Sequence, residues 1–131
     1  MIRTALLAAV AMSHLTAAAQ AEGLTSIRTP AAERLAGLAT TEHLHRLALA
    51  NLIATNCTVA GLSPGDAALI AGSAQEVAAL MGLSTEDYFK DFIGPALPRF
   101  GTDGACEREA DLARDTAAKL RAMGGEVLSQ E

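Results

Sequence analysis

Apolar residues recur at helical spacing in several stretches of this chain. The most regular stretch runs from Thr41 to about Asn56 and carries a broad apolar face formed by Leu44, Leu47, Ala48, Leu49, Leu52 and Ile53. A face this broad predicts a helix at the centre of a bundle. Asn51 lies within it and needs a hydrogen-bond partner if it is buried.

Capping residues predict one helix before this one and one helix after it. Thr29-Pro30 is typical of a helix start, and Gly37 ends that first helix early. Ser63-Pro64-Gly65-Asp66 combines a serine cap, a proline and an acid at capping-box spacing. The third helix that follows ends at Gly82, and it carries core positions at Ala67, Ile70, Ala74, Val77 and Met81.

Two further helices are predicted in the last third of the chain. Ser84-Thr85-Glu86-Asp87 begins the fourth, Gly94-Pro95 ends it, and residues 95–100 follow as a poorly helical connector. The last helix begins near Asp103 to Cys106 and ends at Gly124-Gly125, and residues 126–131 are expected to fray. Its inner face reads Cys106, Ala110, Ala113, Ala117 and Leu120.

Composition supports an all-α fold. Half of the residues are hydrophobic while 3% are aromatic, and alanine and leucine favour helices. No stretch alternates apolar and polar residues long enough to predict a strand. We therefore expect one small bundle of about four to five helices.

The first 21 residues resemble a secretory leader. Arg3 is their one charge, an apolar run follows, and Ala19-Gln20-Ala21 offers small residues for signal peptidase. We expect residues 1–21 to be cleaved and residues 22–131 to form a single helical domain, located in the periplasm or secreted. No second apolar run of spanning length follows, so we expect no membrane insertion after cleavage.

The predicted mature chain is acidic. Without Arg3 it keeps nine basic and 15 acidic side chains, a net charge of −6. This balance argues against nucleic acid as a partner, because phosphate binding depends on Lys and Arg. It permits a protein partner, including a basic one.

Cys57 and Cys106 are the two cysteines. In an oxidising compartment they are expected to form one disulfide that closes a loop of about 50 residues. An intermolecular bridge and free thiols are the alternatives. A redox or metal role is disfavoured because the chain has no C-x-x-C.

A leader, a short helical domain and one long-range disulfide resemble several small bacterial periplasmic families of unknown function. The resemblance rests on Cys57, Cys106 and the segment Met81-Gly82-Leu83-Ser84-Thr85-Glu86-Asp87, and it covers the predicted mature chain in outline. It implies an all-α fold and carries over no functional residues.

The aromatic residues are the first candidates for a site: Tyr88, Phe89, Phe92 and Phe100. They lie close together in sequence, and the main hypothesis is that they add bulk to an alanine-rich core. The alternative is that some are exposed and form a partner or ligand surface.

Titratable residues give weaker signals. Glu42 and His45 have the Glu-x-x-His spacing of di-iron bundles, but His43 is the one other histidine after the leader, so no second motif exists. Glu42–Arg46 and Asp115–Lys119 are spaced for ion pairs on a helix. The acids of the last helix, Glu107, Glu109, Asp111 and Asp115, are expected to form a solvated face that could meet a basic partner.

No catalytic motif, metal site or cofactor site is found in the sequence. We therefore expect a non-enzymatic interaction or accessory protein, of which an inhibitor or immunity protein is one version. The alternative is a carrier of a small apolar ligand, which would need an enclosed pocket beside Phe89, Phe92 and Phe100. The sequence leaves the oligomeric state open.

Overall fold

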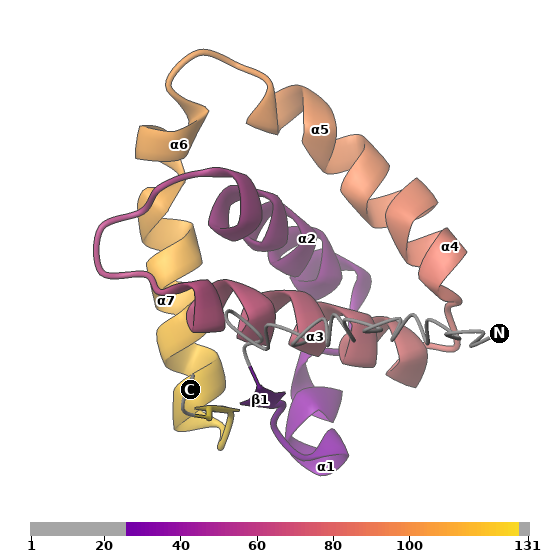
Figure 1. The fold of residues 1–131 in the computed structure, drawn as a ribbon. Helices are drawn as coiled ribbons and strands as arrows, with labels where there is room; N and C mark the ends of the chain where they lie inside the picture. The colour runs from indigo at the N-terminus through magenta and orange to yellow at the C-terminus, as the bar shows by residue number, and fades with distance from the viewer. Residues whose placement is uncertain (1–25, 129–131) are drawn as a thin grey trace, which may run out of the picture.

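Helix α2 (Thr41–Asn56) packs against the other long helices of the fold (Figure 1). The computed structural model describes residues 26–128. In it α2 contacts α3 (Pro64–Leu80), α5 (Gly94–Phe100) and α7 (Ala110–Ala122). Eight of the 16 residues of α2 are buried, which confirms the central position predicted from its broad apolar face.

The remaining elements are short. They are β1 (Ile27–Arg28), α1 (Ala32–Leu35), the 3-10 turn η1 (Ala36–Leu38), α4 (Thr85–Tyr88), the π-helical segment η2 (Phe89–Ile93), α6 (Ala105–Arg108) and β2 (Glu126–Val127). The mostly helical class predicted from the sequence is confirmed. The predicted boundary of the leader, at residue 21, lies outside the described residues.

Side-chain caps mark the starts of α2, α3 and α4. The Ser63 side chain accepts a hydrogen bond from the Asp66 N–H, and the Asp66 carboxylate accepts one from the Ser63 N–H. Ser84 and Asp87 form a second capping box of the same kind at the start of α4. Both helix starts were predicted from sequence, because a capping box needs no tertiary contact. At α2 the cap is Thr40, whose side-chain oxygen accepts a hydrogen bond from the His43 N–H.

The predicted helix end at Gly94-Pro95 is wrong. The chain stays helical from Thr85 to Phe100, because α4 runs through η2 into α5 (Figure 1). In η2 the helix widens, and the Gly94 N–H donates to the Phe89 carbonyl five residues back. Pro95 lies at the start of α5 and Pro98 inside it, and neither can donate a helical hydrogen bond.

The C-terminal segment also differs from the prediction. Residues 126–127 were expected to fray, yet β2 pairs antiparallel with β1, with Ile27 opposite Val127. The last predicted helix is two helices, since Glu109 interrupts it between α6 and α7. Its predicted inner face is confirmed at Ala113, Ala117 and Leu120, which are buried.

A buried hydrogen-bond network joins α2 to α4. Tyr88 is fully buried, and its hydroxyl oxygen accepts a 3.0 Å hydrogen bond from the Asn51 amide. The Thr55 hydroxyl donates to the other end of that amide, the Asn51 Oδ1. The partner that Asn51 was expected to need is therefore Tyr88. Burial raises the pKa of the Tyr88 hydroxyl, although the Asn51 hydrogen bond opposes the rise.

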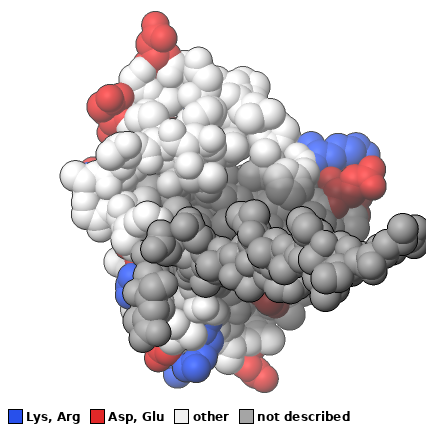
Figure 2. All heavy atoms as spheres, in the orientation of Figure 1, with Lys and Arg blue, Asp and Glu red and all other residues white. Residues whose placement is uncertain are grey.

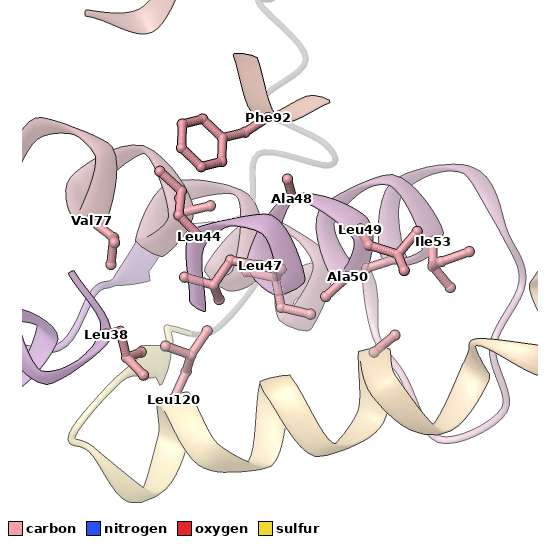
Figure 3. Packing of buried hydrophobic residues seen from close by; sticks show 14 of the residues in the cluster. Leu38, Leu44, Leu47, Ala48, Leu49, Ala50, Ile53, Val77, Phe92 and Leu120 are labelled. Carbon is pink, nitrogen blue, oxygen red and sulfur yellow. The ribbon is translucent and has the colours of Figure 1, made fainter. Parts of the chain in front are cut away.

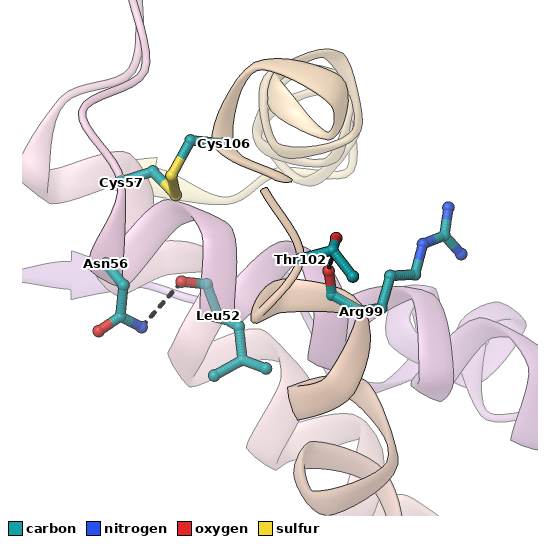
Figure 4. Close-up of a disulfide and its surroundings, with 6 residues drawn as sticks. All are labelled: Leu52, Asn56, Cys57, Arg99, Thr102 and Cys106. Carbon is teal, nitrogen blue, oxygen red and sulfur yellow. Dashed lines mark hydrogen bonds between the residues drawn. A yellow bond between two sulfur atoms is a disulfide. The ribbon is translucent and has the colours of Figure 1, made fainter. Parts of the chain in front are cut away.

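Cys57 and Cys106 form a disulfide, as predicted (Figure 4). Cys57 is the residue that ends α2, and Cys106 lies in α6. The bond therefore fixes the start of the last helical unit against the end of the central helix, across a sequence separation of 49 residues.

Asp66 also links two helices. Its Oδ1 accepts hydrogen bonds from Arg121 Nε at 2.8 Å and Nη2 at 2.6 Å, which joins the start of α3 to the end of α7. Burial by itself raises the pKa of Asp66. The hydrogen bonds from Ser63 and Arg121, with the charge of Arg121, outweigh burial and hold the pKa below its usual value of 3.8.

This lowered pKa predicts acid sensitivity. The stabilisation is present above the unfolded-state value and is lost as the pH falls through the lower folded-state pKa. We expect the difference in unfolding free energy between wild type and Asp66→Asn to shrink between about pH 6 and pH 2.5 in urea titrations. Asp115→Asn, which alters an exposed carboxylate, is the control. A difference that stays constant for Asp66→Asn would contradict the assignment.

Within residues 26–128, no single helix has the length and apolar character needed to cross a membrane. Helix α3 and the α4–α5 run meet that criterion only together, as a pair bent by 112°.

Candidate functional site

The four aromatic residues predicted as a candidate surface occupy different environments. Tyr88 and Phe92 are buried in the core, with 0% and 6% of their surface exposed. Phe100 is partly buried against the core. Phe89 is 48% exposed, and it is the one ring of the four that solvent reaches freely. The structure therefore does not bring the four together as one exposed patch.

Two cavities of similar size lie elsewhere on the described part of the molecule. One of about 590 Å³ is lined by uncharged residues at the end of α2 and the start of α3, including Cys57, Leu62 and Ala67. Figure 2 shows few charged side chains on the face where α2 connects to α3. The other, of about 600 Å³, lies between α2 and α7. Neither has any of the four aromatic residues in its lining.

The cavity between α2 and α7 is open to solvent, and we call it the α2–α7 groove. Its leucines come from η1, α2 and α7 and form its floor, where Leu38, Leu47, Leu49 and Leu120 are each at most 6% exposed. Figure 3 shows Leu38, Leu47 and Leu120 close together in the core. Polar and charged side chains surround them. The full lining is Leu38, His43, His45, Arg46, Leu47, Leu49, Arg99, Glu109, Leu112, Asp115, Thr116, Lys119 and Leu120.

One buried carboxylate in the groove is neutralised. Glu109 is 6% exposed, although it was expected to lie on a solvated acidic face. Its Oε1 accepts a 2.8 Å hydrogen bond from Arg99 Nε, and Arg99 Nη2 lies 2.8 Å from the same oxygen as an ion pair. The interruption between α6 and α7 turns this side chain inward, and the charge pairing offsets the cost of burial. The charge of Arg99 is therefore paired with that of Glu109.

Two cations on the groove are not neutralised in this way. Arg46 and Lys119 were each expected to pair with an acid one turn earlier, Glu42 and Asp115. Among residues 26–128 neither cation has a carboxylate within the 4.0 Å that defines an ion pair. Both predicted pairs are wrong, and both cations are left at the edge of the leucine floor.

The two histidines of the groove are held by their own neighbours. The Nδ1 of His43 lies 2.9 Å from the hydroxyl of Thr40, the residue that caps α2. The exposed ring of His45 lies against Phe92, with 4.5 Å between ring centroids. In residues 26–128, no group of three or more His, Cys, Asp or Glu side chains is arranged to hold a metal ion.

Sequence reasoning did not find this groove. Its residues belong to three segments, near positions 38–49, at 99 and over 109–120, and no local pattern joins them. The one available signal was that the two helical ion pairs were weak, since such pairs contribute about 0.2–0.5 kcal/mol. Tertiary packing easily overrides an interaction of that size.

The comparisons do not place the chain in a family: no protein-family model, no curated protein and no solved structure matches it.

Proposed function

We propose that this is a non-enzymatic binding protein that receives a segment of another protein in the α2–α7 groove. The observation that carries the proposal is the combination of a leucine floor with two cations, Arg46 and Lys119, that have no acidic partner among the described residues. Apolar contact surrounded by charged groups is the usual composition of a protein interface.

The open shape of the groove favours a protein segment over a small apolar ligand. Pockets for small molecules bury most of the ligand surface. A groove that is open to solvent would leave one side of such a ligand in water, whereas a protein segment covers that side with its own structure. The carrier hypothesis also required a cavity beside Phe89, Phe92 and Phe100, and neither described cavity is lined by them.

The side chains of the groove also favour binding over catalysis. His43 is hydrogen-bonded to the helix cap Thr40, His45 packs against Phe92, and Glu109 is neutralised by Arg99. These groups are therefore held by structural partners, while Asp115 and Lys119 are left to contact a bound segment.

A peptide-display selection tests this function. We expect random peptides selected on the wild-type protein to lose binding by about tenfold or more on Thr116→Trp, because the indole fills the groove. Ala118→Trp is the matched control, since Ala118 is exposed on the same helix and does not line the groove. Peptides that bind Thr116→Trp as well as wild type, or a selection that yields no binder, would contradict the proposal.

A rival surface is measured in the same experiment. Phe89, the exposed aromatic residue, lies outside the groove lining. If the selected peptides lose binding on Phe89→Ala and keep it on Thr116→Trp, the interaction surface is at η2 and the groove proposal is wrong.

A further inference from the structure

We infer that the segment received by the α2–α7 groove is an acidic amphipathic helix of a partner protein. The inference rests on the proposed function and specifies the partner. The apolar side of such a helix meets the leucines of the groove, and its flanking carboxylates meet Arg46 and Lys119.

The charge of the groove is opposite to that of the chain. The full sequence has a net charge of −5. The groove is lined by three Arg or Lys side chains and two carboxylates, so its formal charge is +1 with both histidines neutral. Since Glu109 is paired with Arg99, the charges left for a partner are Arg46, Lys119 and the exposed Asp115.

Because the groove is positive while the chain is negative, the groove favours a partner segment of negative charge. Complementary charge raises association rates and disfavours partners of the wrong sign. A basic partner, which the net charge of the chain permits, would meet two unpaired cations in the groove. An acidic segment would be repelled by the rest of the surface and attracted here, which confines it to this site.

The dimensions of the groove favour a helix over an extended segment. Its lining on α7 runs from Leu112 to Leu120, which at 1.5 Å per residue is about 12 Å, or a little more than two helical turns. The walls are helices, whose backbone groups are already hydrogen-bonded. An extended peptide would find no strand edge to pair with, while a helix satisfies its own backbone and presents anchors at i, i+4 and i+7.

Two synthetic peptides of about four helical turns test the inference. Both carry leucines at i, i+3, i+4 and i+7, and the residues that flank this stripe are glutamate in one peptide and lysine in the other. We expect the glutamate peptide to bind the wild-type protein about tenfold more tightly in fluorescence anisotropy, with the difference decreasing as salt is added.

Charge-reversed proteins give the matched comparison. The double variant Arg46→Glu, Lys119→Glu should reverse the preference between the two peptides. Lys90→Glu removes an exposed cation that does not line the groove, and it should keep the wild-type preference within about twofold. Circular dichroism of each variant checks that its helix content is unchanged.

The outcomes separate this inference from the proposed function. If the lysine peptide binds as tightly as the glutamate peptide and Thr116→Trp still blocks both, the groove function stands and the acidic preference is wrong. If Thr116→Trp affects neither peptide, both proposals are wrong. In a third outcome neither peptide binds, dodecanoate binds, and Thr116→Trp blocks the binding of dodecanoate. The occupant is then a small anionic amphiphile, and both proposals are wrong.

Discussion

Cys57→Ser lowers the free energy of unfolding by about 4 kcal/mol, the largest single effect that we expect for this protein. The disulfide joins two residues that are 49 positions apart in the sequence. Without it the unfolded chain has more conformational entropy, which favours unfolding. A helical domain of this size has a typical total stability of 5–15 kcal/mol. The variant should therefore unfold at a much lower urea concentration than wild type.

Reduction of the disulfide provides the control for this experiment. Wild type in reducing buffer and the double variant Cys57→Ser, Cys106→Ser should both match the single variant, and the double variant should not respond to reductant. An unchanged urea midpoint for the double variant would show that the bond contributes no stability.

Tyr88→Ala and Phe89→Ala should differ widely although the two residues are adjacent. Tyr88 is fully buried, so truncation leaves a cavity and removes the partner of the Asn51 amide, at a cost of about 4 kcal/mol. Phe89 is 48% exposed, and its truncation should cost less than about 1 kcal/mol. Urea or thermal unfolding measures both.

Tyr88→Phe separates the hydroxyl from the ring. It keeps the packing and leaves the buried Asn51 amide without its acceptor, so we expect a loss of about 1–3 kcal/mol. Equal losses for Tyr88→Ala and Phe89→Ala would contradict the division of the aromatic residues into core and surface.

The parts of the fold that were predicted correctly depend on local interactions. The capping boxes at Ser63 and Ser84 and the left-handed Gly82 are each determined within a few residues. The disulfide was predicted because the chain has only two cysteines and was expected to reach an oxidising compartment. The secretory leader, its cleavage and export remain predictions.

The parts that were predicted wrongly depend on more distant contacts. The helix continues past Pro95 because η2 shifts the hydrogen-bond register before the proline, and periodicity alone does not reveal that shift. The C-terminal residues pair with β1, which lies at the other end of the described chain. Glu109 was assigned to a solvated face because its partner Arg99 is on another helix.

The candidate site was predicted less well than the fold. The aromatic residues were identified as a cluster, but their separation into core and surface required the bundle geometry. The groove depends on how α2 crosses α7, and its charge depends on which side chains that crossing brings together. The net charge of the chain is negative while that of the groove is positive. A sum over all residues does not show where on the surface the charges lie.

The short ladder between β1 and β2 has a mechanical consequence. Ile27 is opposite Val127, and the Leu128 N–H donates to the Ser26 carbonyl at 2.8 Å, so both strands leave the ladder at the same end. A pulling force applied through residues 26 and 128 would unzip these hydrogen bonds one after another instead of shearing them together. While Cys57 and Cys106 stay bonded, the segment between them is shielded from that tension, and only the chain outside the loop can extend.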